Sequence, residues 1–168
     1  LPMAAAAAAA GTRPIIGIFT QPTSRDDPTP MLAASYVKFV EMAGGRAAPF
    51  FHNSTREQLR ETFSAVNGVL FPGGSSSVTR GAPLREAAEF VYDLAVAENA
   101  AGGVFPVHGT CLGFEMLSLI VARTDDGVLS DFDAEDCASE LTPHKGDTHV
   151  WQASKLYGLA SPPPPSRA

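Results

Sequence analysis

The sequence is poor in cysteine, in long apolar runs and in clustered positive charge. Its 168 residues include two cysteines, Cys111 and Cys137, which are too few for the disulfide framework of a small secreted domain. No apolar run approaches the ~20 residues needed to cross a bilayer, so we expect no membrane partner. The 12 basic residues form no patch that would indicate a nucleic-acid partner.

Positive charge is missing altogether from one segment. Between Thr124 and Leu141 there is no lysine or arginine, although 7 of the chain's 18 acidic residues lie there. The remainder carries 12 basic and 18 − 7 = 11 acidic residues and is nearly neutral. We interpret the acidic segment as solvated, because it lacks the periodicity of a packed element. The overall composition, 45% hydrophobic and 18% charged, is typical of a soluble globular protein.

Both ends of the chain lack the patterns of folded structure. Residues 1–12, "LPMAAAAAAAGT", are of low complexity and have neither the basic start nor the leucine-rich core of a signal peptide. Residues 142–168 show no helix or strand periodicity and contain four consecutive prolines, Pro162–Pro165. We expect this tail to be disordered, because it cannot bury enough apolar surface to offset its chain entropy. The predicted folded domain therefore covers residues 13–141.

Strand-like and helix-like segments alternate within this domain. Short apolar runs predict strands, and recurrence at three- and four-residue spacing predicts helices. The predicted strands cover residues 14–19, 46–51, 68–71 and 104–107, and the predicted helices cover 32–43, 54–65, 83–99 and 112–121. In the first helix the apolar side chains that recur at helical spacing are Leu32, Tyr36, Phe39, Val40 and Ala43, and Gly44-Gly45 is its predicted stop. Such alternation favours an α/β fold with a doubly wound, mostly parallel sheet and flanking helices. Sites in these folds form at the carboxyl ends of the strands.

Two glycine-containing turns follow predicted strands at that edge. Gly109-Thr110-Cys111-Leu112-Gly113 has the form of a nucleophile elbow with cysteine in place of serine, and its helix dipole favours the thiolate. The Leu112 amide would face the oxyanion formed on attack. A second donor is required, and the Gly73-Gly74 turn of the preceding strand is its natural source. A lone cysteine is more often a small buried hydrophobe, but the two turns together favour catalysis.

The sequence offers no clear base for this cysteine. A cysteine nucleophile normally needs a histidine that an acid orients. The four histidines are His52, His108, His144 and His149. His52 and His108 follow strands, whereas the other two lie in the tail, and none has an acidic partner in a predicted element.

Four blocks of the sequence resemble the N-terminal half of the gamma-glutamyl hydrolases, peptidase family C26 of the class I glutamine amidotransferase-like superfamily. They are "PIIGIFTQ", "AASYVKFVEMAGGR", "VNGVLFPGGS" and "PVHGTCLGFEMLSL". The resemblance runs from about Arg13 to Arg123, and Glu115 stands where amidotransferases more often carry glutamine.

The resemblance implies a flavodoxin-like fold and cysteine-dependent hydrolysis of gamma-linked glutamates in folate and antifolate polyglutamates. It implies no cofactor or metal, a homodimer, and a vacuolar, lysosomal or secreted location. Cys111 matches the nucleophile, and Leu112 and Gly74 match the oxyanion amides. The implied substrate-binding residues are Tyr36, Gly73, Ser75 and Glu115.

The sequence also departs from the family's pattern. Family members are longer, and their catalytic histidine comes from a downstream block resembling Trp-His-Pro-Glu, which this chain lacks. We therefore expect a domain truncated on its C-terminal side, with little activity by itself. Two alternatives stay open: a non-catalytic ligand-binding or dimerisation fragment, and a glutaminase-type amidotransferase domain. Glu115 argues against the second.

Overall fold

The computed structural model describes residues 13–24, 26–134 and 136–138. By its contacts the chain divides into one unit of residues 1–130 and another of residues 131–168. All helices and strands of the described residues belong to the first unit. The predicted domain boundary at residue 141 and the predicted disorder of residues 142–168 lie outside the described residues.

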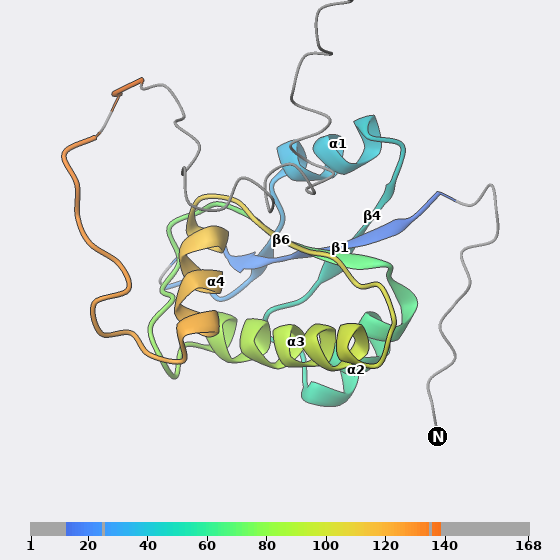
Figure 1. Cartoon of the computed structure of the whole chain (residues 1–168). Coiled ribbons are helices and arrows are strands. Elements are labelled where there is room, and N and C mark those ends of the chain that lie inside the picture. The colour runs from blue at the N-terminus through green and yellow to red at the C-terminus, as the bar shows by residue number, and fades with distance from the viewer. Residues whose placement is uncertain (1–12, 25, 135, 139–168) are drawn as a thin grey trace, which may run out of the picture. The chain divides into compact units, whose positions relative to one another are not determined.

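A four-stranded parallel sheet forms the centre of the first unit (Figure 1). Its order is β4-β1-β5-β6, so the first strand in sequence lies inside the sheet. The strands are β1 (Ile15–Phe19), β4 (Arg46–Phe50), β5 (Gly68–Phe71) and β6 (Val107–Gly109). This arrangement confirms the predicted mostly parallel α/β fold. The sequence did not predict the small antiparallel pair β2 (Gln21–Pro22) and β3 (Pro30–Met31).

Helices cover both faces of the sheet (Figure 1). They are α1 (Ala34–Met42), α2 (Arg56–Ala65), α3 (Pro83–Ala100) and α4 (Leu112–Ala122). On one face, α1 packs over Ile18 and Leu70 through Val40. On the other face, α2, α3 and α4 share the larger apolar core with the strands. The helices therefore follow the doubly wound arrangement that the alternating sequence predicts.

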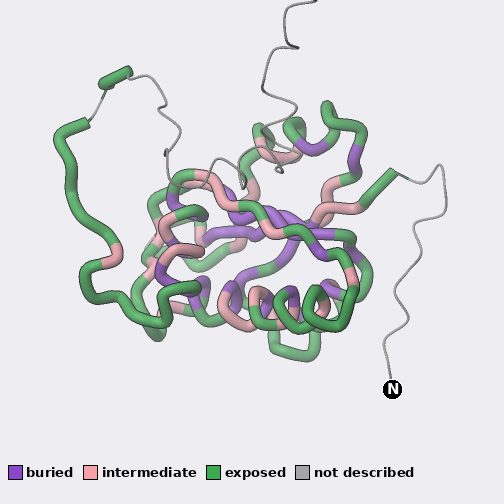
Figure 2. The backbone as a smooth tube through the Cα atoms, in the orientation of Figure 1, coloured by how far each residue is buried: buried purple, intermediate pink, exposed green. Residues whose placement is uncertain are grey.

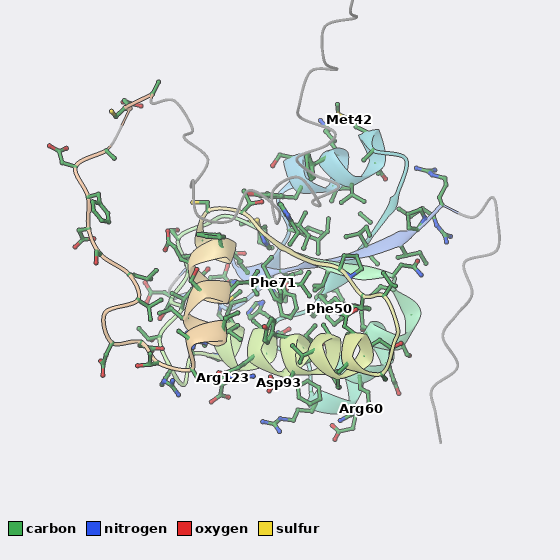
Figure 3. All side chains as sticks on the ribbon, in the orientation of Figure 1. Met42, Phe50, Arg60, Phe71, Asp93 and Arg123 are labelled. Atoms are coloured by element: carbon green, nitrogen blue, oxygen red, sulfur yellow. The ribbon has the colours of Figure 1, made fainter. Side chains whose placement is uncertain are left out.

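The side chains of β1 explain why both faces need cover. Ile16 and Ile18 face α1, whereas Phe19 faces the larger core, as the two-residue period of a strand requires. Phe19 stacks on Phe50 with ring centroids 5.2 Å apart and lies 4.7 Å from the ring of Phe71. Figure 3 labels Phe50 and Phe71 between the sheet and α3.

Local chemistry fixes where two helices begin and end. Thr55 caps α2 by accepting from the amide of Gln58, whose side chain in turn accepts from the Thr55 amide. The predicted stop after α1 is also present, since Gly44 holds a φ of 89° that favours glycine.

Two details differ from the sequence predictions. The fourth strand was expected over residues 104–107, but β6 covers Val107–Gly109. Val104 is instead 88% exposed, and the amide of Phe105 bonds to Asn99 at the end of α3. The periodicity of α1 also placed Phe39 on its packed face, but that ring is 60% exposed. In Figure 2 the buried segments concentrate in the strands and in the helix faces turned toward them.

Candidate active site

Cys111 lies at the turn between β6 and α4, in a backbone conformation that favours glycine. Its φ is 50° and its ψ is −119°, and it is the N-cap residue of α4. The thiol is free and exposed. The Cys111 carbonyl accepts from the amides of Phe114 and Glu115 at 2.8 and 3.0 Å, which fixes the first helical turn. A strained residue that carries a reactive group at a strand-to-helix turn is the arrangement of a nucleophile elbow.

The two glycines around Cys111 have steric reasons. A Cβ at Gly113 would overlap the backbone carbonyl of Phe71 in β5. A Cβ at Gly109 would come within 2.7 Å of the Gly113 carbonyl oxygen. The strand, the helix and β5 therefore approach as closely as their backbones allow. This close approach accounts for the spacing of the Gly-x-Cys-x-Gly motif.

The loop after β5 runs directly beside the cysteine. A Cβ built on Gly73 would lie 3.1 Å from the Cβ of Cys111 and 2.7 Å from the Tyr36 hydroxyl. The Gly73 amide donates to that hydroxyl at 2.7 Å. Tyr36 of α1 thus ties this loop to the helix on the opposite face of the sheet from α4. Its described contact is with the backbone of the loop, and its predicted role in binding substrate stays a prediction.

The Gln21 side chain binds the same loop through hydrogen bonds, a role that the sequence did not reveal. The side chain is buried, and its Nε2 donates to the carbonyls of Pro72 and Gly73 at 3.2 Å each. Its Oε1 accepts from the Ser76 hydroxyl at 3.0 Å. A Cβ at Gly74 would overlap the Gln21 amide group, so only glycine leaves room for this packing.

Two backbone amides on the segments beside Cys111 make no hydrogen bond with a described residue. Among the described residues, no hydrogen bond uses the amides of Leu112 or Gly74. The Gly73 amide, by contrast, is taken by Tyr36. The sequence predicted Leu112 and Gly74 as the oxyanion donors, and this assignment stays a prediction.

The remaining predicted residues flank this centre. Glu115 is half-buried in the first turn of α4, four residues after Cys111. Ser75 is exposed and lines a cavity whose described lining does not include Gly73. The structure therefore brings Tyr36, Gly73 and Cys111 into contact and places Ser75 and Glu115 on the adjoining segments.

No described histidine reaches the thiol. His52 is buried and its Nδ1 lies 3.1 Å from the Thr20 hydroxyl, and burial lowers the pKa of its imidazole. His108 is exposed on β6, with Nε2 3.4 Å from the Thr110 hydroxyl. Among the described residues, no hydrogen bond involves the Cys111 sulfur. His144 and His149 lie outside the described residues.

The described part of the chain also lacks two other features. No group of three His, Cys, Asp or Glu side chains within it is arranged to hold a metal ion. None of its helices combines the length and apolarity needed to span a bilayer.

Comparison with known proteins decides the family. The model of the family described as Peptidase C26 matches residues 14–124, which include every element from β1 to α4. The chain belongs to the Peptidase C26 family. This confirms the resemblance seen in the sequence, and the matched segment ends one residue after the αL residue Arg123 that closes α4.

Curated relatives of this Peptidase C26 chain carry consistent names. It is 40% identical to "Gamma-glutamyl hydrolase 1" of Arabidopsis thaliana over 136 residues, which are 77% of this chain and 38% of that protein. It is 37% identical to "Gamma-glutamyl hydrolase" of Homo sapiens over 141 residues, or 82% of this chain and 43% of that protein. The Bos taurus "Gamma-glutamyl hydrolase" is 41% identical over 71% of this chain and 38% of its own length. The chain thus spans about two fifths of the length of these relatives.

Proposed function

We propose that this chain carries the nucleophile half of a cysteine-dependent hydrolase of gamma-glutamyl bonds. The observation that carries the proposal is the exposed Cys111 thiol at the strained elbow, with Gly73 packed beside it and with the amides of Leu112 and Gly74 left without a described partner. An electrophilic carbonyl placed there would meet a nucleophile and two hydrogen-bond donors at once.

The proposed reaction follows from that placement. The Cys111 thiolate attacks the carbonyl carbon of the gamma-linked amide, and the carbonyl oxygen becomes an oxyanion. The amides of Leu112 and Gly74 donate to this oxygen, where negative charge develops. Collapse of the intermediate forms a thioester and expels the amine, which must take up one proton. Water then hydrolyses the thioester and returns the free thiol.

The loop contacts explain how the second donor is kept in position. Gln21 binds the carbonyls before Gly74, and Tyr36 binds the amide of Gly73. With both neighbours held, the Gly74 amide needs no rearrangement when the oxyanion forms, which is the condition for effective electrostatic stabilisation. Tyr36, Gly73, Ser75 and Glu115 are the residues that we propose bind substrate around this centre.

The substrate class rests on the family resemblance. The printed names of the relatives specify gamma-glutamyl bonds. Folate and antifolate polyglutamates are the substrates that the resemblance implies, and we propose them for this chain. A vacuolar, lysosomal or secreted location, a homodimer and a family domain ending near residue 141 are proposed on the same ground.

We further propose that the chain has little activity by itself. Expulsion of the amine and hydrolysis of the thioester both need a group that transfers protons. Among the described residues, neither His52 nor His108 contacts the thiol, because each bonds to a threonine hydroxyl instead. The proposed site therefore has a nucleophile and an oxyanion site without a described base.

Chemical rescue tests both parts of the proposal. Release of glutamate from a folate polyglutamate is measured for the full chain, with and without added imidazole as an external base. We expect turnover near background alone, an increase with imidazole, and no increase for Cys111→Ala. The matched control is Cys137→Ala, because Cys137 is the other free exposed cysteine.

The outcomes separate the two parts. Robust turnover without imidazole that is lost in Cys111→Ala would contradict low activity and support the hydrolase. Equal background in wild type and Cys111→Ala at high imidazole would contradict the hydrolase. Ammonia release from glutamine that depends on Cys111 would favour a glutaminase instead.

A further inference from the structure

A cavity lies beside the loop that carries Gly73 and Gly74. It is a cavity of about 300 Å³, and Cys111 is not among the residues that line it. Its walls come from residues 22–24 and Pro28 after β1, His52 after β4, Ser75–Ser77 after β5, and residues 82–84 at the start of α3. The cavity thus opens at the carboxyl ends of β1, β4 and β5.

The strand order gives a reason for a hollow at this place. From β1 the chain leaves over one face through α1, whereas from β5 it leaves over the other face through α3. Neighbouring strands whose connections diverge in this way leave a crevice at their carboxyl ends, and ligands of open α/β sheets bind in such crevices.

His52 lines this crevice and can offer it one donor, the Nε2–H group. The residue is only 5% exposed, and Thr20 beside it is 2% exposed. The Thr20 oxygen already accepts from the His52 amide at 3.1 Å, so its own proton has the Nδ1 atom, also at 3.1 Å, as its described acceptor. The tautomer that satisfies the Thr20 hydroxyl proton makes Nδ1 the acceptor and puts the proton of the neutral ring on Nε2. Burial lowers the pKa of His52, which keeps this ring neutral near pH 7.

The Nε2 atom has no hydrogen-bond partner among the described residues. Within that part of the chain, the buried side-chain nitrogen and oxygen atoms left without a partner include only Nε of Arg85. Nε2 of His52 consequently keeps accessible surface, and His52 is one of the residues that line the cavity. A donor of a residue so deeply buried usually has a partner, which here would be a ligand or water.

Other neutral donors surround the same space. The Ser75 hydroxyl makes no hydrogen bond with a described residue and lines the cavity. The start of α3 adds the Leu84 amide, because the helix has no side-chain cap and Pro83 has no N–H. The described residues that line the cavity include no aspartate, glutamate, lysine or arginine.

We propose that this cavity binds the carboxylate group of a small organic acid. A carboxylate accepts several hydrogen bonds in one plane and suits a site of neutral donors at a helix N-terminus. A phosphate dianion carries more charge and is commonly met by arginine or lysine, which the described lining lacks. The proposal uses neither the Cys111 thiol nor its oxyanion amides, and Ser75 is the one residue that it shares with the proposed hydrolase.

The test is binding of glutarate to the full chain, followed by ligand-observed NMR. Glutaramide, the uncharged diamide of the same length, is the matched ligand. We expect glutarate to bind and glutaramide to bind at least tenfold more weakly. Removing one donor in His52→Ala should weaken glutarate about 5–10-fold. His52→Gln, which keeps an N–H donor, should recover part of the loss.

Two more variants keep the test decisive. Ser75→Ala removes an exposed hydroxyl without disturbing packing and should weaken glutarate about threefold or more. His108→Ala, which removes an exposed histidine outside the cavity, should leave binding unchanged, as should Cys111→Ala. A dependence on Cys111 would place the acid at the thiol and overturn the proposal.

The remaining outcomes are equally clear. Equal binding of glutarate and glutaramide, absence of glutarate binding, or insensitivity to both His52→Ala and Ser75→Ala would each overturn the site. Inorganic phosphate is added as a competitor of glutarate. If the cavity binds phosphate more tightly than glutarate, the assignment to a carboxylate is overturned. Unfolding of His52→Ala would leave His52→Gln and Ser75→Ala to decide the matter.

Discussion

Cys111 stores backbone strain at the one position where the thiol must project from the sheet edge. Its φ of 50° and ψ of −119° form a combination that residues with a Cβ atom avoid. Such a residue costs of order 1–3 kcal/mol and persists only where the surroundings fix it. Here the fixing comes from the close contact of Gly113 with β5 and of Gly109 with α4.

The strain predicts an unequal response to two small substitutions. Cys111→Gly and Cys111→Ala both remove the thiol, but only glycine relaxes the backbone. We expect Cys111→Gly to exceed Cys111→Ala in free energy of unfolding by about 1 kcal/mol, after allowance for the larger chain entropy of glycine. Urea unfolding of the two variants measures the difference. A more stable alanine variant would show that the turn is not strained.

The close approach at Gly113 predicts a reversal of helix propensity. Alanine in place of glycine inside a helix normally raises stability by about 1 kcal/mol. At Gly113 the added methyl would overlap the Phe71 carbonyl, a backbone atom that cannot rotate away. We expect Gly113→Ala to lower the free energy of unfolding by about 3 kcal/mol. A neutral or stabilising result in urea unfolding would contradict this account of the motif.

At this scale the sequence predicted the residues of the motif but not its supports. The glycine spacing around Cys111 is local, so its purpose could be deduced from the chain itself. Gln21 and Tyr36 act on Gly73 across 52 and 37 residues of sequence. Neither has a local pattern that announces such a contact, because the sheet alone brings these segments together.

Among the elements, a buried arginine connects α3 with the segment that follows α4. Arg85 is fully buried in the first turn of α3, and its guanidinium lies 3.4 Å from the Asp125 carboxylate. It also donates to the Val78 carbonyl at 3.1 Å. Arg123, at the end of α4, pairs with Asp93 of α3 nearby, as the labels in Figure 3 indicate. These contacts hold the end of α4 against α3.

The buried guanidinium predicts a strong effect at Asp125 and none at its neighbour. Asp125→Asn removes the nearer of the two carboxylates that pair with Arg85, leaving only that of Glu89 at 4.0 Å, so we expect a loss of about 2 kcal/mol in the free energy of unfolding. Asp126→Asn is the matched control, since that side chain is exposed and makes no ion pair with a described residue. Equal effects of the two variants would show that Asp125 acts only through the general charge of the segment.

Elements were predictable where periodicity and local stops agree. The strand at residues 68–71 and the helix starting at Pro83 have the expected bounds. The strand expected at 104–107 is displaced toward the C-terminus. The Asn99 side chain bonds to the N–H and C=O groups of Phe105, and pairing of β6 with β5 begins only at Val107. Such side-chain-to-backbone hydrogen bonds depend on the geometry of the turn and produce no apolar pattern in the sequence.

At the scale of the whole molecule, burial of His52 links folding to pH. Burial lowers the pKa of His52 below its ordinary value of 6.5. As the pH falls below 6.5, the unfolded chain therefore takes up a proton that the folded chain resists. The stabilisation is present above that pH and is lost progressively as the pH falls.

This linkage predicts a different acid sensitivity for a variant without the imidazole. Between pH 7.5 and 5.5, wild type should lose more free energy of unfolding than His52→Gln, by at most about 1.4 kcal/mol per pH unit. Carboxylate titration is common to both proteins and cancels in the comparison. His108→Gln, at an exposed histidine, should behave like wild type in the same urea series. Identical losses for wild type and His52→Gln would contradict the linkage.

The sequence by itself determined the alternation of strands and helices, the elbow around Cys111 and the family resemblance, because each depends on residues that are neighbours in the chain. Only the tertiary structure decided that the Gly73 amide donates to the Tyr36 hydroxyl and that the Gln21 side chain packs against Gly74. It also placed His52 beside Ser75 in one cavity. The physical reason is the strand order, which brings the ends of β1, β4 and β5 together although long connections separate them in the chain.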